Sequence, residues 1–311
     1  MRRWRSLRGC ERVILCCGEA LIDMLPSGDG FRPSPGGAVY NTALALGRLG
    51  VATGLLWPIS RDGFGGMLRG PLAEAGVDLS LCPESPRPTT LAFVTFRDGE
   101  AQYSFYDEGT AGRDGFAPVL PDHVRALFIG GISLIPDAPA QAVAALVAKA
   151  QGRLVMLDPN IRPAMIPDLP AHRARILALA AQATVVKLSA EDIRALWPGS
   201  APETVAAGLL AQGAALVLLT QGAQGATAFR SHAALHRPAP RVAVADSIGA
   251  GDCFDAGFLT SLAAQDLLTP QALANAPDSA VEAALDHAIR IAALSLSRPG
   301  CNPPWAHEVQ P

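Results

Sequence analysis

A carboxylate stands directly behind a glycine turn in residues 246–258, which read DSIGAGDCFDAGF. Gly249 and Gly251 let the backbone approach a ligand without interference from a Cβ atom. The backbone N–H groups of residues 249–252 would be left free at the start of the helix that follows, which suits an anion. Asp252 would not help to bind an anion, but it could take a proton from a hydroxyl that attacks a phosphoryl group. The turn could therefore host both reactants of a phosphoryl transfer.

The same stretch has a simpler interpretation. Gly249, Ala250 and Gly251 could form only a tight connection between a strand at 241–245 and a helix, with Asp252 as a helix cap, because Asp is a common N-cap residue. Taken alone, the turn leaves the two interpretations about equal. The chain has no GxxxxGK[ST] sequence and no GxGxxG after its first predicted strand, which argues against a P-loop enzyme and a Rossmann dehydrogenase.

Side chains that could bind hydroxyls are predicted near the start of the chain. Asp23 follows the buried strand predicted for 13–18, and ligands of open α/β sheets collect at the carboxyl ends of strands. Gly36 and Gly37 precede a helix that ends at Gly50, and Asn41 in its first turn offers both a donor and an acceptor. A solvated turn for Asp23 and a plain helix start for the glycines are the simpler alternatives.

A second polar group follows the strand predicted for 154–157. Asp158, Asn160 and Arg162 in the sequence DPNIR could hold sugar hydroxyls or a phosphate, although Asp-Pro-Asn is also ordinary turn chemistry. Farther on, Glu191 and Asp192 lie in the first turn of a helix capped by Ser189, where acids suit the helix dipole.

Strands and helices alternate in the elements that position these residues. Strands are predicted at 126–132, 154–157, 184–188 and 216–220, and helices at 138–151, 171–183 and 280–297. Alternation requires crossover connections, and hence a mostly parallel sheet covered on both faces. Residues 89–96 and 101–106 predict a hairpin joined through Asp-Gly, which could cover a polar site as a lid. The polar segment 107–115 could fold against a ligand or form a plain surface loop.

The composition predicts a globular protein. The chain has 311 residues, half of them hydrophobic, and a net charge of −3, which gives no long-range attraction to nucleic acid or to an anionic membrane. Residues 1–12 form a basic extension that we expect to be disordered, and the apolar run behind it is too short for a signal peptide. Six scattered cysteines indicate neither a zinc site nor a disulfide framework. We expect a cytoplasmic protein without a membrane span.

Two segments of the chain resemble the signatures of the ribokinase-like (PfkB) carbohydrate kinases. Residues 246–252 are similar to the C-terminal signature and residues 35–50 to the N-terminal one, in the right order and about 210 residues apart. The resemblance covers residues 13–304. It implies an α/β protein with a ribokinase-like three-layer α/β/α sandwich, a mostly parallel central sheet and a small β lid near 19–35 and 89–115. Residues 13–311 would form a single kinase domain, and a homodimer through the lid is implied.

The resemblance also implies roles for individual residues. It makes Gly249, Ala250 and Gly251 an anion hole and Asp252 the catalytic base. Sugar-binding residues would be Asp23, Gly36, Gly37, Asn41, Asn160 and Arg162. Residues at the ATP would be Lys187, Ser189, Thr220, Gly222, Gly225 and Gly251. Glu191 and Asp192 would organise Mg²⁺ through waters, and Asp246 with the Ile248 carbonyl would hold K⁺. The family carries Glu where this chain has the shorter Asp192.

Within the family, residues 158–163, 186–189 and 300–305 are most similar to bacterial fructokinases. The expected reaction is ATP-dependent transfer of phosphate to a primary hydroxyl of a small sugar, D-fructose becoming fructose 6-phosphate. The alternatives are a 2-keto-3-deoxygluconate kinase, in which Arg162 would face a carboxylate, then a ribokinase or nucleoside kinase. A non-catalytic sugar-sensing pseudokinase is the alternative from another class. Met165 and Ile166 replace the Leu-Trp that often follows the Arg, which weakens the subfamily assignment.

Overall fold

An eight-stranded sheet forms the centre of the protein. The structure is a computed structural model and describes residues 13–97 and 100–309. The strands lie in the order β14-β13-β12-β11-β10-β9-β1-β4, and the six from β12 to β4 run parallel. Their bounds are β1 Val13–Cys17, β4 Thr53–Leu56, β9 Val124–Gly130, β10 Leu154–Asp158, β11 Val185–Ser189, β12 Leu216–Thr220, β13 Ala226–Phe229 and β14 Ala234–Arg237. The mostly parallel sheet predicted from the alternation is confirmed.

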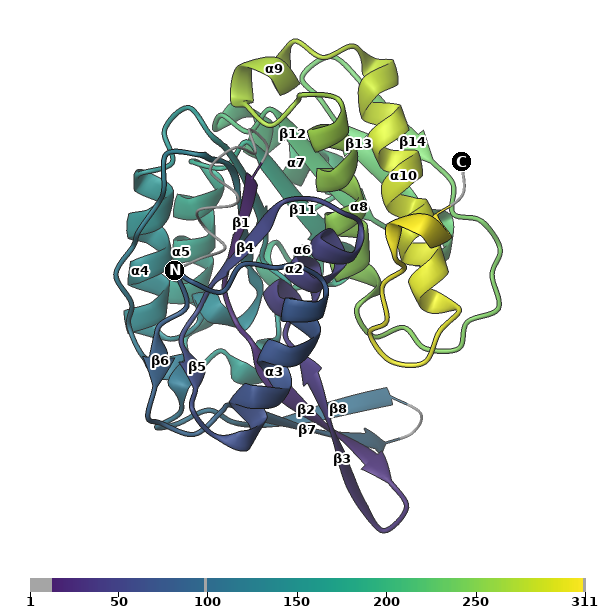
Figure 1. Ribbon diagram of the computed structural model, residues 1–311. Helices are drawn as coiled ribbons and strands as arrows, with labels where there is room; N and C mark the ends of the chain where they lie inside the picture. The colour runs from purple at the N-terminus through teal and green to yellow at the C-terminus, as the bar shows by residue number, and fades with distance from the viewer. Residues whose placement is uncertain (1–12, 98–99, 310–311) are drawn as a thin grey trace.

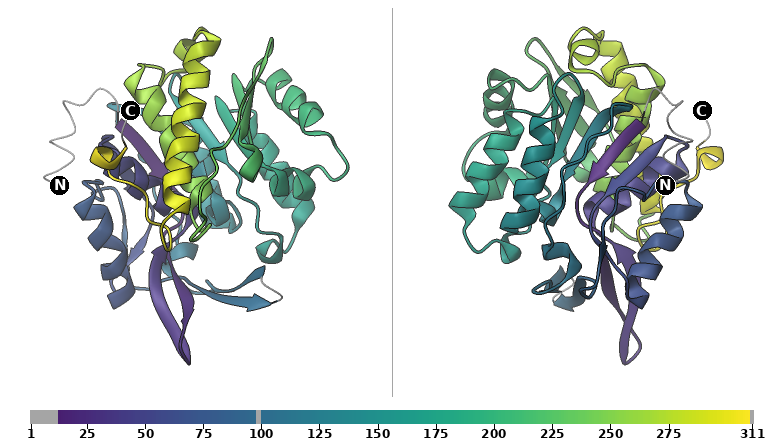
Figure 2. Two further views of the ribbon diagram at one scale, coloured as in Figure 1. Left: turned by 90° about the vertical axis from the view of Figure 1, so that its right-hand side faces the viewer. Right: turned by 60° about the vertical axis from the view of Figure 1, so that its left-hand side comes forward.

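Helices cover both faces of this sheet and complete the three predicted layers (Figures 1 and 2). Because successive strand residues point to opposite faces, β1 contributes Ile14 and Cys16 to one core and Val13, Leu15 and Cys17 to the other. The first core includes side chains of α2 (Ala38–Arg48), α3 (Gly63–Glu74), α8 (Ala250–Ala264), α9 (Pro270–Ala274) and α10 (Asp278–Leu296). The second includes side chains of α4 (Asp137–Ala148), α5 (Leu169–Ala180), α6 (Ala190–Leu196) and α7 (Pro202–Ala211).

A separate four-stranded sheet lies where the β lid is predicted, and Figure 1 shows it projecting from one end of the molecule. Its strands, in order across the sheet, are β3 (Gly30–Gly36), β2 (Leu21–Ser27), β7 (Leu91–Arg97) and β8 (Glu100–Tyr106). The Asp-Gly turn predicted between β7 and β8 lies outside the described residues.

Short elements make the remaining connections. β5 (Ile59–Ser60) and β6 (Glu84–Ser85) pair with each other. The 3₁₀ turns are η1 Ala111–Arg113, η2 Gly131–Leu134, η3 Pro163–Met165, η4 Gly222–Gln224 and η5 Ala306–Glu308. Across the described ranges no helix combines the length and apolarity that a membrane crossing requires.

One predicted element is wrong. Residues 241–245 are not a strand but an exposed extended segment, held by a hydrogen bond from the Ala245 N–H to the Leu296 carbonyl at 2.8 Å. The alternation of Val and Ala suggests a half-buried strand, yet Val242 and Val244 are both exposed because β14 already forms the sheet edge. The basic extension at 1–12 lies outside the described residues, so its predicted disorder stays a prediction.

Candidate active site

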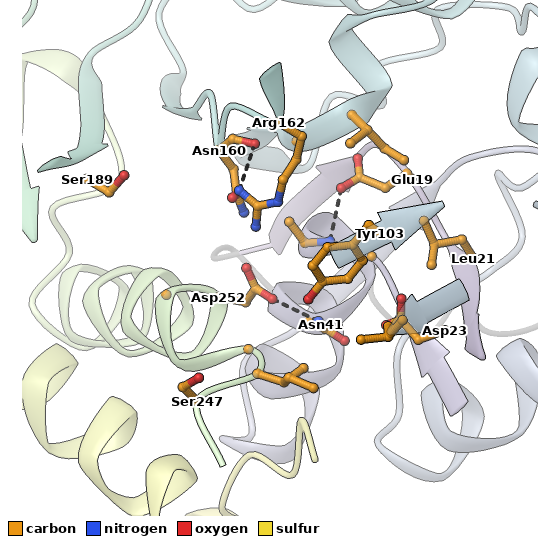
Figure 3. Close-up of a pocket in the computed structure, with 18 of the residues that line it drawn as sticks. Glu19, Leu21, Asp23, Asn41, Tyr103, Asn160, Arg162, Ser189, Ser247 and Asp252 are labelled. Atoms are coloured by element: carbon orange, nitrogen blue, oxygen red, sulfur yellow. Dashed lines mark hydrogen bonds between the residues drawn. The ribbon is translucent and has the colours of Figure 1, made fainter. Parts of the chain in front are cut away.

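A cavity of about 650 Å³ opens between the carboxyl ends of the central strands and the lid. Figure 3 shows side chains from the sheet, the lid and α8 converging on it. The predicted residues that line it are Asp23, Gly37, Asn41, Asn160, Arg162, Lys187, Ser189, Glu191, Asp192, Thr220, Asp246, Ile248, Gly249, Gly251 and Asp252. The predicted residues outside the lining are Gly36, Ala250, Gly222 and Gly225. The structure thus brings together most residues that the sequence places far apart.

The glycine turn forms the N-terminus of α8. Gly249 is its N-cap in the left-handed region (φ 74°), and no side chain caps the helix there. A Cβ atom on Gly249 would lie 2.3 Å from the Cys301 sulfur, so both backbone and space require glycine. Gly251 and Asp252 in the first turn line the cavity. This turn, called the anion turn below (residues 249–252), can therefore bind a negatively charged group through its backbone N–H groups, of which that of Ala250 also donates to the Ser247 carbonyl at 3.4 Å.

Asp252 is buried at the anion turn, and Asn41 is its partner. The Asn41 amide nitrogen donates to the Asp252 carboxylate at 2.8 Å (Figure 3). Burial raises the pKa of Asp252 to about 6, although the hydrogen bond from Asn41 acts to lower it. At neutral pH the carboxylate is therefore mostly ionised, and its pKa is close enough to 7 for a general base. The amide oxygen of Asn41 is buried and has no partner among residues 13–97 and 100–309, so it can accept from a ligand hydroxyl.

Glu19 is a buried carboxylate of this site that the sequence analysis missed. It accepts hydrogen bonds from the backbone N–H groups of Ala38 at 2.9 Å and Ser133 at 3.2 Å. Burial raises the pKa of Glu19 to about 7, against the lowering effect of these bonds. Glu19 thereby ties the start of α2 to the turn after β9. The available signal was its position directly after β1, at the same sheet edge as the other polar residues.

Asp23 lies in the lid strand β2 and faces the cavity. Burial raises its pKa to about 7, and the charge of Asp252 adds to the shift while Arg162 opposes it. A Cβ atom on Gly36, which pairs with Leu21 in the neighbouring strand β3, would lie 2.1 Å from the Asp23 carboxylate. Gly36 therefore leaves space for the Asp23 carboxylate and does not itself line the cavity.

The lid contributes further cavity residues that the sequence analysis did not single out. The strand register places Leu21, Asp23, Val94, Tyr103 and Phe105 on one face of the lid, and all of them line the cavity. These strands alternate as half-buried strands do, so no sequence signal distinguishes the cavity face from the outer face. Segment 107–115, predicted as a ligand cover or a surface loop, contributes no residue to this cavity.

Asn160 and Arg162 follow β10, as predicted, and both line the cavity (Figure 3). Asn160 adopts φ 44°, a left-handed conformation that Asn tolerates better than most residues. The Arg162 guanidinium donates to the Ile161 carbonyl at 3.1 Å and to the Asn160 carbonyl at 3.4 Å. Its charge lowers the pKa values of Asp23 and Asp252, so it lies near both carboxylates.

Lys187 lies at the floor of the cavity beneath the anion turn. Its ammonium pairs with Asp158 at 2.8 Å, and both side chains are almost fully buried. Its nitrogen lies 3.4 Å from the position that a Cβ atom on Gly251 would take. Burial acts to lower the pKa of Lys187, but the neighbouring acids, Asp158 above all, raise it above its usual value. Lys187 is therefore a permanent positive charge at this end of the cavity.

The acids predicted for magnesium are already engaged with the protein. Asp192 accepts from the backbone N–H groups of Ile161 and Ser189, both at 2.7 Å, and forms a capping box with Ser189. Glu191 is exposed and pairs with Arg194 at 2.9 Å. Residues 13–97 and 100–309 contain no group of three or more His, Cys, Asp or Glu side chains that could bind a metal directly. The expected water-mediated role of Glu191 and Asp192 at Mg²⁺ therefore stays a prediction.

The predicted nucleotide glycines belong to the β12–β13 connection. Thr220 lines the cavity, but Gly225 supports the backbone: a Cβ atom there would lie 2.1 Å from the Arg237 carbonyl. Gly222 begins η4 with φ 57°. These two glycines shape the turn next to the cavity.

Asp246 joins the anion turn to the C-terminal loop. Its carboxylate accepts from the backbone N–H groups of Ile248 at 3.0 Å and Gly300 at 2.9 Å. These two bonds hold the loop that carries Cys301 against Gly249. A substitution at Asp246 should therefore shift the backbone of the anion turn.

The comparisons with known proteins agree with this geometry. The sequence profile of the pfkB family carbohydrate kinases matches residues 14–308. A curated fructokinase of Rhizobium leguminosarum bv. trifolii is 45% identical over 283 residues, which are 86% of this chain and 87% of the relative.

Solved structures show the same architecture. The structure of a fructokinase with bound ATP from Xylella fastidiosa matches with a TM-score of 0.85 and 32% identity, and 93% of each chain is covered. A ribokinase II of Escherichia coli in complex with ATP and Mg²⁺ matches with a TM-score of 0.80 and 27% identity, covering 93% of this chain and 94% of the other.

Proposed function

We propose that this chain, which belongs to the pfkB family of carbohydrate kinases, transfers the γ-phosphate of ATP to the 6-hydroxyl of D-fructose. The observation that carries the proposal is the position of Asp252: a buried carboxylate at the anion turn, in one cavity with the hydroxyl-binding side chains Asp23 and Asn41. The 45% identity to the Rhizobium fructokinase supports fructose as the sugar.

The chemistry requires a base and a place for the transferring phosphoryl group. Asp252, ionised at neutral pH, takes the proton of the attacking hydroxyl. The N–H groups of residues 249–252 stabilise the negative charge that spreads over the phosphoryl oxygens. Lys187 adds a fixed positive charge on the same side of the cavity. Because acceptor and phosphoryl group meet at one turn, positioning contributes much of the rate.

The sugar would lie between the lid and α2. Asp23 and the free amide oxygen of Asn41 accept hydrogen bonds from ring hydroxyls, and Gly37 permits close approach of the backbone. The apolar lid face with Phe105 and Val94 excludes water from the ring. A primary hydroxyl on its flexible arm then reaches Asp252 while the ring stays fixed.

ATP and a divalent cation complete the site. Mg²⁺, when bound, neutralises charge on the nucleotide phosphates. Because the Asp192 oxygens are occupied by backbone N–H groups, Glu191 and Asp192 would hold it through waters, as predicted from the resemblance. The purine would lie near η4 and the exposed Val242 and Val244, whose segment is bonded to the end of α10.

A potassium ion beside the anion turn is part of the proposal. Asp246 and the Ile248 carbonyl would be its ligands, and the bonds from Asp246 to Ile248 and Gly300 link that position to the anion turn. Activity should therefore rise when K⁺ replaces a bulky organic cation at constant ionic strength. An unchanged rate would remove the ion from the proposal.

A 2-keto-3-deoxygluconate kinase is the second candidate, because Arg162 lines the cavity and its guanidinium donates only to backbone carbonyls within the described part of the chain. Arg162→Ala, assayed on fructose and on the keto-deoxy acid, separates the two. If the wild type prefers the acid and its use collapses selectively in the variant, Arg162 binds a carboxylate. Ribokinase and nucleoside kinase follow, and ATP turnover with any sugar would exclude a pseudokinase.

The outer face of the lid favours a homodimer. The strand register places Met24, Phe93 and Tyr106 on the outer face of the lid, opposite the cavity face. The rings of Phe31 and Tyr106 meet the ring of Phe93 edge-on, with centroid distances of 4.9 and 5.3 Å. Phe31 is 43% and Tyr106 63% exposed, which suits contact with a second copy. Light scattering of wild type and Tyr106→Glu would test this, with a dimer expected only for the wild type.

The cytoplasm is the proposed location. The five described cysteines are free thiols, and three of them are fully buried, as is usual in a reducing compartment.

A further inference from the structure

Asp255 is a buried acid without an ordinary hydrogen-bond donor. It lies one helical turn after Asp252 in α8, and none of its surface is exposed. Among the described residues, no nitrogen or hydroxyl donates to either carboxyl oxygen. Its neighbour is another acid, Asp158, which adds to the effect of burial and raises the pKa of Asp255 both through its charge and through the hydrogen bond that two adjacent carboxyl groups can share. Two carboxyl groups can share a hydrogen bond only if one of them carries a proton, and an ionised carboxylate without donors would be costly to bury.

Asp158 has the contacts of the ionised partner. One oxygen accepts from the Lys187 ammonium at 2.8 Å and the other from the Asn160 N–H at 3.2 Å. Its charge is thus compensated by hydrogen bonds from a lysine and from a backbone N–H, whereas Asp255 accepts neither kind of bond from the described residues and only feels the Lys187 charge. The proton shared by the two acids therefore belongs to Asp255.

We propose that Asp255 is a neutral carboxylic acid that donates its O–H to Asp158, and that this acid pair holds the Lys187 ammonium beneath the anion turn. Asp255 is then a positioning residue, because it acts through Asp158 and Lys187 and not on the substrate. The catalytic part of this inference rests on the proposed kinase function, since it concerns the charge that meets the phosphoryl group.

The charges around Lys187 explain why a neutral Asp255 is useful. Three acids act on Lys187, with Asp158 having the largest effect, then Asp255 and Asp192, and Asp252 acts on Asp255 from the preceding turn. Burial raises the pKa of Asp255 well above its usual value; Lys187 opposes this, and Asp158 and Asp252 add to it. If Asp255 were ionised, one more negative charge would repel an anion from the turn. As a neutral acid it keeps the hydrogen bond and removes that repulsion.

Activity of two amide variants tests the role of Asp255. Asp255→Asn keeps the shape, the neutrality and an N–H donor to Asp158, so kcat should stay within about threefold of wild type with an unchanged acid limb of the pH profile. Asp158→Asn removes the partner of a buried lysine and should lower activity by about a hundredfold or more, or prevent folding. If Asp255→Asn were as damaging as Asp158→Asn, Asp255 would act as a charge and the proposal would be wrong.

A stability measurement tests the proton itself and needs neither sugar nor nucleotide. Above pH 3.8, the usual pKa of the side chain, the unfolded wild type loses a proton that the folded Asp255 keeps. Folding then takes up this proton, so the unfolding constant of wild type relative to Asp255→Asn should rise about tenfold per pH unit, as read from denaturant titrations at a series of pH values. A pH-independent ratio would show that folded Asp255 is ionised. That failure would leave the fructokinase proposal untouched.

Discussion

The two ends of the cavity are built in different ways. The phosphoryl end consists of the backbone N–H groups of the anion turn and fully buried charges on the central sheet and α8. The proposed sugar end combines the start of α2 with side chains on the strands of the lid, of which Tyr103 is 37% exposed and Asp23 half-buried. The phosphoryl end is therefore fixed by the core, whereas the sugar end depends on how the lid lies over the cavity. This difference assigns the rate of the chemistry to the first region and the choice of sugar to the second.

The largest effect of a substitution at the phosphoryl end is expected for Asp252. Asp252→Asn keeps the shape and removes the base, so kcat for fructose should fall ~10²–10⁴-fold. Because Asn41 can still bond the side chain, folding and sugar binding should remain. Coupled turnover assays and calorimetric titration would measure the two effects, with Asp29→Asn on the β2–β3 turn as control. Wild-type turnover in the Asp252 variant would refute its assignment as the base.

Asp23 should affect the sugar and spare the nucleotide. Asp23→Ala removes the acceptor of hydrogen bonds from the sugar hydroxyls. Each hydroxyl left unpaired costs on the order of 1–3 kcal/mol of binding free energy, so kcat/KM for fructose should fall about 10- to 100-fold. The Kd for ATP should stay unchanged, since Asp23 lies on the lid strand β2. Asp29→Ala at the exposed turn of the same hairpin is the matched control. An equal loss of ATP affinity would contradict the division into two regions.

Acidification should lower the catalytic rate, because it protonates the proposed base Asp252 at the phosphoryl end. Because the pKa of Asp23 is raised to about 7 and that of Asp252 to about 6, kcat/KM should begin to fall below about pH 7 and fall more steeply below about pH 6, where the base becomes protonated. The hydrogen bond from Asn41 lowers the pKa of Asp252, so Asn41→Ala should move the acid limb to higher pH. Rate profiles of both proteins at saturating ATP would check this. An acid limb at the same pH in the variant would show that Asn41 does not tune the base.

The smallest effect is expected on the lid. Tyr103→Phe removes one hydroxyl from the cavity, and KM for fructose should rise about two- to tenfold with kcat nearly constant. Tyr106→Phe, on the outer face of the same strand, should leave KM unchanged. Initial-rate measurements on both variants suffice. Equal effects of the two substitutions would show that the cavity face has no special role.

The sequence predicted the phosphoryl end better than the sugar end for a physical reason. A glycine turn before a helix leaves a local signal, since Gly249 needs both its φ and its space, and the strands around it are apolar runs. Asp255 left no such signal, because its neighbour Asp158 is distant in sequence, and Glu19 left only its position after β1, since its partner Ser133 is also distant. The cavity face of the lid depends on strand register, which the alternation of Tyr103 and Phe105 cannot reveal. No strand forms at 241–245, because β14 already occupies the edge of the central sheet.

The central claim is that fructose is the sugar and that its 6-hydroxyl is the acceptor. A competition assay would give the wild-type enzyme ATP, Mg²⁺ and equal concentrations of fructose, 2-keto-3-deoxygluconate, ribose and adenosine, and identify the products by phosphorus NMR. Fructose 6-phosphate should form first and in excess. Predominant phosphorylation of the keto-deoxy acid, or transfer to another hydroxyl of fructose, would contradict the account.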